Sequence, residues 1–341
     1  MPCYHPLKAF PVGLTAAGKT QYKIVPYGVH HLEQRNGTLV PIDSDFVSPY
    51  AERVILDFVT VPCGHCVGCR IDYSRQWANR CMLELEYHDS AFFITLTYDD
   101  DHVPRSWYAD PETGEAFESL TLRKKDFQDF MKRLRYYFPD DHIRFFAAGE
   151  YGSNTFRPHY HAIVFGLHLT DLQLFRQSPD GFNYYSSPTL CKVWPFGFVA
   201  IANVSWDTCA YTARYVMKKL TGPEAEFYED HNIEPPFTLM SRKPGIAKQW
   251  YDDHPDLYDY EYINISTPTG GKKFRPPKYF DKLFDVDCPE KSAELKAIRR
   301  RMAEEAQKAK MQRTDLSFIE YLAVEEEAKL NSVKKLERSK V

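Results

Sequence analysis

Apolar residues repeat with a helical period in two segments of the chain. Across residues 71–87 an apolar or aromatic side chain recurs at every fourth position, at Tyr73, Trp77, Cys81 and Leu85. Residues 122–138 show the pattern of an amphipathic helix that ends before a proline, and its apolar face consists of Phe127, Phe130, Met131, Leu134 and Phe138. Its other faces carry Lys124, Lys125, Lys132, Arg133 and Arg135. These cations form either a solvated face or a DNA-facing one.

Other segments have the alternation and β-branched or aromatic content of strands. They are AFFITLTYDD (91–100), IRFFAAGEY (143–151), HYHAIVFGL (159–167) and a run around 197–204. The turn-rich GSNTFRP separates the second from the third and predicts a hairpin. WDTCAYTARYVMKKL (206–220) predicts a helix capped by Asp207 or Thr208.

The remaining segments carry weaker patterns. Residues 1–60 contain prolines and only short strand-like runs, so we expect them to be irregular, and residues 99–119 predict a polar loop. Residues 223–280 are loop-rich and include the small basic turn GKKFRPPK. From about Pro289 the chain is charged and alanine-rich, which predicts a helical tail.

Composition narrows the class of protein. With 341 residues, 43% of them hydrophobic, the chain can bury a large core. Its net charge of −4 does not indicate a nucleic-acid binder, so any basic surface must be local. The first residues lack the pattern of a signal peptide, and no run of about 18 apolar residues is present, so we expect an intracellular protein without a membrane span. In that compartment clustered cysteines favour a metal over disulfides.

The run RPHYHAIVFG (157–166) places two histidines at the start of an apolar strand. His159 and His161 must share one face because strand side chains alternate. If the preceding strand pairs with this one as a hairpin, Glu150 lies opposite His159. Two imidazoles and one carboxylate leave positions open for water and a phosphate oxygen, which suits a divalent Lewis acid.

This metal hypothesis has competitors. An H-x-H pair also occurs without a metal, and Glu150 could be an ordinary exposed hairpin carboxylate. A cupin would need a glutamate a few residues after the second histidine, but residues 162–167 are apolar or glycine. A histidine-triad hydrolase would need a third alternating histidine, and that position is Ile163.

Two tyrosines in the helical segment suggest what such a metal could assist. Tyr211 and Tyr215 are four residues apart and share one helix face. Each is followed three residues later by a cation, Arg214 or Lys218, and Lys219 adds another. Attack on a polarised phosphodiester would leave a 5′-phosphotyrosine and a free 3′-hydroxyl, storing the bond for rejoining. The alternative is that these aromatics merely pack in the core.

Taken in order, FITLTY (93–98), RPHYH (157–161) with Glu150 upstream, and YTARYVMKK (211–219) resemble the HUH endonucleases that initiate rolling-circle replication. The Y-x-x-x-Y form looks like the replication initiators of microviruses. PCGHCVGCR (62–70) and the EYG…RPHYH…FG run are similar to the gokushovirus branch of these bacteriophages. The resemblance covers roughly residues 90–220.

The resemblance implies an α+β fold with an antiparallel sheet of about five strands and helices on one side. We expect this endonuclease core at 89–222, after an irregular zinc-binding-like segment at 1–88 and before a loop-rich extension at 223–287 and a charged helical tail at 288–341. It implies that Glu150, His159 and His161 ligate a divalent metal. Phosphate chemistry favours Mg²⁺ or Mn²⁺, although imidazoles also accept zinc.

The resemblance also implies roles and partners. Tyr211 and Tyr215 match the paired nucleophiles, and Lys218 matches the lysine of the Y-x-x-K signature. Arg157, Arg214 and Lys219 are candidate contacts to single-stranded origin DNA. Because the chain has no G-x4-G-K-[ST] motif, a host helicase must unwind the duplex, and we expect a host polymerase as a further partner. The host bacterial cytoplasm is the expected location.

A second candidate metal site lies upstream. Cys63, Cys66 and Cys69 form C-x2-C-x2-C, with Gly64 and Gly68 allowing tight turns. A fourth ligand could be Cys3, Cys81 or His65, and we favour a structural zinc that uses Cys3. An iron–sulfur cluster and unmetallated thiols are the alternatives. A zinc-stabilised DNA-binding adaptor without catalysis would explain this cluster but not the tyrosine pair.

Overall fold

The computed structural model describes residues 3–338 except 17, 153, 154, 179, 180, 182, 215–224, 268 and 269. The chain forms two compact units, one made of residues 1–72 and 297–341 and the other of residues 73–296. Within the described ranges, no helix is both long enough and apolar enough to span a membrane.

The larger unit is built on a seven-stranded antiparallel sheet, which is wider than the five strands expected. Across the sheet the order is β12 (Gln173–Gln177), β13 (Asn183–Ser186), β14 (Val199–Asn203), β7 (Ala91–Thr97), β11 (Pro158–Phe165), β10 (Arg144–Tyr151) and β15 (Phe237–Met240). The sequence patterns had indicated four of these strands, and the three that they did not indicate are β12, β13 and β15. Each is only four or five residues long, so its periodic signal is short.

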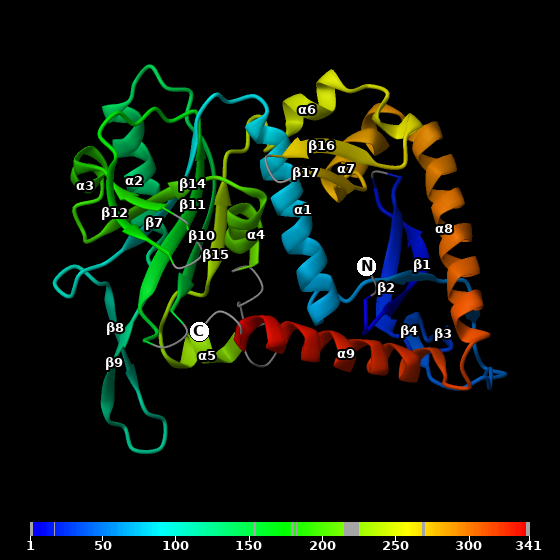
Figure 1. Ribbon diagram of the computed structural model, residues 1–341. Helices are drawn as coiled ribbons and strands as arrows, with labels where there is room; N and C mark the ends of the chain where they lie inside the picture. The colour runs from blue at the N-terminus through cyan, green and yellow to red at the C-terminus, as the bar shows by residue number, and fades with distance from the viewer. Residues whose placement is uncertain are drawn as a thin grey trace. The chain divides into compact units, whose positions relative to one another are not determined.

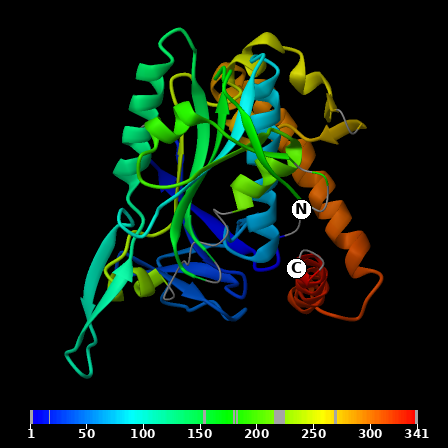
Figure 2. The ribbon, with the colours of Figure 1, turned by 60° about the vertical axis from the view of Figure 1, so that its left-hand side comes forward.

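Helices cover both faces of this sheet, not one face as expected (Figures 1 and 2). Along β11, Tyr160, Ala162 and Val164 pack with α2 (Lys124–Tyr137) and α3 (Pro188–Val193). Ile163 and Phe165 point the other way and pack with α1 (Val67–Leu85) and α4 (Trp206–Arg214). A strand buried on both faces reads as a continuous apolar run, so AIVF is the sequence feature that agrees with a helical layer on each side.

One buried tyrosine pins α2 to the central strand. The Tyr160 hydroxyl donates to the carbonyl oxygen of Arg123 (2.8 Å), accepts from the Arg123 amide (3.2 Å) and lies 2.7 Å from the Tyr98 hydroxyl. The bond from the Arg123 amide satisfies a donor at the start of α2 that the helix itself cannot pair. The apolar face of α2 is buried much as its sequence predicted.

The cations of α2 lie on the side of the sheet opposite the histidines. Lys125 and Lys132 pair with Asp129, and Arg133 donates to the carbonyl oxygen of Val193. The odd-numbered residues of β11, which include both histidines, face α4 instead. This placement favours the solvated reading of the basic face.

Residues 99–119 do not form the expected loop. They contain a hairpin of β8 (Arg105–Ala109) and β9 (Ala116–Leu120), which extends from the sheet in Figure 1. The turn closes because the Asp110 carboxylate accepts hydrogen bonds from the amides of Glu112 and Thr113, and Gly114 adopts a φ of 72°. Acidic residues at the turn masked the strand signal on either side.

Residues 223–287 are more ordered than their sequence indicated. Besides β15 they contain α5 (Glu226–Asp230), α6 (Lys248–Asp253), a short 3-10 helix η3 (Leu257–Asp259), β16 (Ile263–Thr267), β17 (Gly270–Phe274) and α7 (Lys278–Asp287). α8 (Pro289–Met311) then begins. Trp250 and Phe280 stack in the core on the α1 side, so aromatic packing holds these short elements.

The smaller unit is also ordered, which corrects the expectation of an irregular N-terminal segment. It has two three-stranded antiparallel sheets, in the orders β2–β1–β6 and β4–β3–β5. Their strands are β1 (Leu7–Leu14), β2 (Thr20–Pro26), β3 (His31–Arg35), β4 (Thr38–Ile42), β5 (Arg53–Ile55) and β6 (Val59–Val61). A small core around Phe10 and Leu32 stabilises them. The helical tail is confirmed, with α9 spanning Phe318–Arg338.

The Tyr160 network generates a stability prediction. Replacing Tyr160 with Phe removes the hydroxyl and leaves the Arg123 amide without its acceptor, while the Arg123 carbonyl keeps only the Asp126 amide, so we expect the free energy of unfolding to fall by about 1–3 kcal/mol. Urea unfolding followed by circular dichroism measures this change. Tyr136→Phe is the matched control, because Tyr136 is 83% exposed and its loss should change stability by less than about 0.5 kcal/mol. Equal stabilities of the two variants would contradict the assigned role.

Candidate active site

Three expected metal ligands converge on one face of the central sheet. β10 and β11 pair so that Glu150 lies directly opposite His159, as the hairpin predicted. The Glu150 Oε1 atom lies 2.7 Å from His159 Nε2 and 3.4 Å from His161 Nε2. These separations suit three atoms that share one ion, because adjacent ligands at about 2.1 Å from a metal are about 3 Å apart.

The other ring nitrogen of each histidine is engaged, which orients the imidazole. His161 Nδ1 lies 2.9 Å from the hydroxyl oxygen of Thr95 on β7, and His159 Nδ1 lies 3.1 Å from the backbone carbonyl oxygen of Arg157. A carbonyl can only accept, so His159 Nδ1 carries a proton, and Nε2 is the ring atom that faces Glu150 and would bind a metal. Second partners of this kind fix the orientation of metal-binding histidines.

The electrostatics of the site favour an ionised carboxylate. Glu150 is only 2% exposed, and burial alone would raise its pKa. Hydrogen bonds and charge from His159 and His161 outweigh burial and lower the pKa of Glu150 to about 2. The carboxylate is therefore ionised and can act as an anionic ligand. Because its position is poorly solvated, its charge requires nearby cationic or hydrogen-bonding groups.

One of the two expected nucleophiles lies beside this cluster. The ring of Tyr211, on α4, has its centroid 5.4 Å from that of His161 in an edge-on arrangement. The Phe93 ring stacks on that of His161 at 5.5 Å and meets the Tyr211 ring edge-on at 6.0 Å, so the three rings form one cluster. Tyr211 remains 41% exposed, so a substrate can reach a tyrosine that already touches a candidate metal ligand.

The local sequence brings α4 close to the sheet. Cys209, Ala210 and Ala213 are buried and small, which lets the helix backbone approach the strands beneath. The Ser74 hydroxyl of α1 donates to the carbonyl oxygen of Ala210 at 3.1 Å. The close packing of α4 therefore fixes the position of Tyr211.

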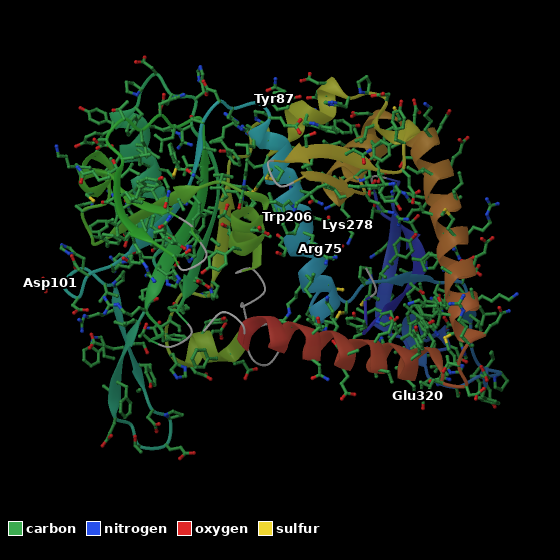
Figure 3. All side chains as sticks on the ribbon, viewed as in Figure 1. Arg75, Tyr87, Asp101, Trp206, Lys278 and Glu320 are labelled. Atoms are coloured by element: carbon green, nitrogen blue, oxygen red, sulfur yellow. The ribbon has the colours of Figure 1, made fainter. Side chains whose placement is uncertain are left out.

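The start of α4 differs from the expected one. Ser205 is the cap, since its hydroxyl accepts from the Thr208 amide (3.2 Å) while the Thr208 hydroxyl accepts from the Ser205 amide (2.8 Å). Asp207 and Thr208 both lie inside the helix, so the expected cap at either residue was wrong. Trp206, labelled in Figure 3, begins the helix and donates from its indole to Asn79 of α1.

The structure describes the side chain of only one of the three candidate DNA-binding residues, Arg157. The Arg157 guanidinium binds the Asp100 carboxylate (2.5 Å) and the carbonyl oxygen of Tyr98 (3.0 Å), so it holds the loop that follows β7. Arg214 is the last described residue of α4, and its side chain is outside the described part of the structure. Tyr215, Lys218 and Lys219 also lie outside the described residues.

The sequence reasoning missed Thr95 and Phe93, which lie on the strand paired with β11. Thr95 lies directly opposite His161 in that pairing. Both belong to the FITLTY run that carried the family resemblance, and their alternation places them on the face of the histidines. Knowledge of the β7–β11 pairing would have identified them.

The four expected zinc ligands also come together, at a separate place in the smaller unit. The sulfur atoms of Cys3, Cys63, Cys66 and Cys69 all lie within 4.8 Å of one another.

Comparison with known proteins assigns the family. A model of the replication-associated protein ORF2/G2P family matches residues 91–220. Replication-associated protein ORF2 of Spiroplasma virus 4 is 33% identical over 286 residues, which cover 82% of this chain and 85% of that protein. The chain belongs to this family of replication-associated proteins.

Two further members of the replication-associated protein family are similar to the chain. VP4 of Bdellovibrio phage phiMH2K is 28% identical over 272 residues, covering 76% of this chain and 80% of that protein. ORF4 of Chlamydia phage 1 is 32% identical over 168 residues, 47% of this chain and 38% of that protein. No solved structure matches the chain. Membership confirms the likeness to phage replication initiators that the motifs indicated, and the likeness of fold to HUH endonucleases stays a prediction.

The Thr95 contact generates a metal-binding prediction. Thr95→Val removes the partner of His161 Nδ1, and loss of such an outer contact weakens metal affinity by about 10–100-fold. Titration with Mn²⁺ followed by electron paramagnetic resonance measures the affinity. Thr95→Ser keeps the hydroxyl and should restore most of it. An unchanged affinity in Thr95→Val would show that the contact does not orient the ligand.

Proposed function

We propose that this replication-associated protein is a metal-dependent endonuclease and strand-transferase that nicks single-stranded origin DNA and rejoins it during rolling-circle replication. The observation that carries the proposal is the contact between Tyr211 and His161, since it places a nucleophile beside two imidazoles and a carboxylate. Family membership supports replication as the process.

The donor set suits a divalent ion. Glu150, His159 and His161 provide one carboxylate oxygen and two imidazole nitrogens, and three ligands leave positions open for a substrate oxygen. When bound there, Mg²⁺ or Mn²⁺ would polarise the scissile phosphodiester and offset charge in the transition state. The low pKa of Glu150 keeps its carboxylate ionised for this purpose.

The residues of the chain would carry out a transesterification of the DNA backbone. The Tyr211 oxygen attacks phosphorus, the bond from phosphorus to the 3′-oxygen breaks, and the proton lost by tyrosine ends on the released 3′-hydroxyl. The product is a 5′-phosphotyrosine ester and a free 3′-end. Because the ester conserves the bond energy, attack by a later 3′-hydroxyl rejoins the strand and restores the tyrosine.

The tyrosine pair suits two rounds of this chemistry. Tyr215 lies four residues after Tyr211, so a continued helix would present both hydroxyls on one face, and one could cut while the other holds DNA. Lys218 would supply positive charge to the phosphate during attack. Arg157, Arg214 and Lys219 would then contact the DNA backbone near the scissile bond.

The proposal extends to organisation and partners. The endonuclease core would occupy residues 89–222, preceded by the cysteine-bearing segment at 1–88 and followed by the segments at 223–287 and 288–341. Since the chain lacks a P-loop motif, a host helicase would unwind the duplex and a host polymerase would extend the 3′-end. The protein would act in the cytoplasm of the host bacterium.

The competing function is a zinc-stabilised adaptor that binds DNA without cutting it. Such an adaptor needs the cysteine cluster but has no use for a tyrosine against a buried Glu–His–His group. Covalent chemistry separates the two functions, because only the endonuclease leaves DNA attached to protein after denaturation.

The decisive experiment is covalent capture. Incubation with 5′- and 3′-labelled single-stranded origin DNA and Mn²⁺ should yield a denaturant-resistant protein–DNA band, carrying only the label downstream of the cut. Tyr211→Phe and Tyr215→Phe combined should abolish this band, because no hydroxyl remains to form the ester. Electrophoresis under denaturing conditions measures the loss.

Tyr184→Phe provides a control, since Tyr184 is a partly buried tyrosine of the same unit on β13. It should leave the yield of adduct unchanged. An undiminished band in the double tyrosine variant would contradict the mechanism, and a wild-type protein that binds the DNA but forms no adduct would support the adaptor.

A further inference from the structure

Four cysteines far apart in the sequence meet in the smaller unit. Cys3 lies at the N-terminus, Cys63 and Cys66 lie between β6 and α1, and Cys69 lies in the first turn of α1. The sulfurs of Cys63 and Cys69 are 4.0 Å apart, as are those of Cys3 and Cys66. This is about twice the length of a disulfide bond, so the four thiols are close but not bonded to one another.

The spacing fits one ion at the centre of a tetrahedron. With zinc–sulfur bonds of about 2.3 Å, tetrahedral geometry places neighbouring sulfurs about 3.8 Å apart. All four sulfurs here lie within 4.8 Å of one another. A four-iron cluster binds each cysteine through a different iron and would hold the sulfurs further apart, so the spacing favours a mononuclear site.

Backbone amides surround the sulfurs in a way that suits thiolates. The amides of Tyr4 and Cys69 both point to Cys66 Sγ, at 3.4 Å each, and the amide of Cys66 points to Cys63 Sγ at 3.3 Å. The amide of Cys63 points to Cys3 Sγ at 3.2 Å. Four thiolates on one divalent ion carry a net charge of −2, and these N–H groups together with the positive end of α1 offset it.

The structure also decides among the possible fourth ligands. His65 is exposed, and its Nδ1 contacts the carbonyl oxygen of Cys63. Cys81 is fully buried in the core of the larger unit, where it packs near Cys209. Cys3 is the residue whose sulfur joins the other three. Gly64 adopts a φ of 85°, the left-handed conformation that the turn between the first two ligands requires, whereas Gly68 lies in the helix.

The last helix of the chain packs against this cluster. Leu322 of α9 is buried with Tyr4, Cys66 and Val67, and Phe318 adds to the contact. His5 Nε2 lies 2.6 Å from the Glu326 carboxylate. The thiols therefore lie where the N-terminal residues, the start of α1 and α9 meet, in a unit whose other apolar core is small.

We propose that Cys3, Cys63, Cys66 and Cys69 bind one structural zinc ion. The ion would hold the N-terminus against α1 and stabilise the surface on which α9 packs. The role is independent of the proposed nuclease chemistry. A bound ion stabilises only the folded arrangement, so its removal should loosen both the residues that follow Cys3 and the helix that contacts them.

Metal content of the full-length protein tests the stoichiometry. After purification without added metal, elemental analysis should find one zinc per chain, and Cys3→Ser should lower this to near zero. Cys288→Ser is the matched control, because Cys288 is a partly buried free thiol at the end of α7, outside the cluster. His159→Ala with His161→Ala should keep the zinc, so failure here is distinguishable from failure of the catalytic proposal.

A second measurement covers the case in which Cys3→Ser folds poorly. Replacing zinc by Co²⁺ in the wild-type protein should produce the strong visible bands and thiolate-to-cobalt charge transfer of a tetrahedral four-sulfur site. Hydrogen exchange should then show faster exchange in 4–14 and 318–333 for zinc-stripped protein than for zinc-loaded protein. Absence of metal in the wild type, zinc retained in Cys3→Ser, or iron with labile sulfide would each overturn the proposal.

Discussion

The pairing register of three central strands is the constraint on which the candidate site depends. In the β10–β11–β7 ladder, Glu150 lies opposite His159, and Thr95 lies opposite His161. Side chains alternate across a sheet, so a slip of one residue would send a ligand to the opposite face. Buried packing prevents that slip, because Tyr160 is fixed by hydrogen bonds on one face while Ile163 is buried on the other. Gly149 adds to the constraint, since a Cβ there would lie 2.8 Å from the Phe237 ring on β15.

The chemistry of the candidate site depends on how its side chains are buried and paired on these strands. Glu150 is buried and ionised, which is costly unless positive charge or hydrogen bonds compensate, and the two histidines provide this. α4 then brings Tyr211 against the His161 ring. The small residues on the buried face of α4 matter for this reason, because bulkier ones would move the tyrosine away from the sheet. The positions of Glu150, His161 and Tyr211 are therefore consequences of core packing as much as of local sequence.

The sequence predicted the parts of the molecule that local periodicity controls. The hairpin carrying Glu150 and His159, the amphipathic α2 and the helical tail follow from turn residues and from 2- or 3.6-residue periods. Short strands escaped prediction: β15 has four residues, and β8 and β9 flank an acidic turn that looks like a loop. The N-terminal sheets escaped for the same reason, since strands of three to eight residues interrupted by prolines carry little pattern.

The sequence also could not predict which residues meet in the tertiary structure. Thr95 is one of two threonines in an otherwise apolar strand, and only the β7–β11 pairing reveals that it meets His161 Nδ1. The sequence left Cys3, Cys81 and His65 open as the fourth cysteine-site ligand, and long-range folding brings Cys3 to the other three. Such contacts join residues about 60 or more positions apart, which no local period encodes.

In the proposed mechanism, the Glu–His–His group and the tyrosines of one helix act together on DNA. Mass-spectrometric mapping of the nucleotide-bearing peptide, after reaction with single-stranded origin DNA and Mn²⁺, tests it most directly. We expect a nucleotide joined through its 5′-phosphate to Tyr211 or Tyr215. The yield of the modified peptide should fall at least 100-fold in Glu150→Gln, which corresponds to about the 2.7 kcal/mol that loss of one charged stabilising group costs. A nucleotide attached to any other residue, or an equal yield in Glu150→Gln, would contradict it.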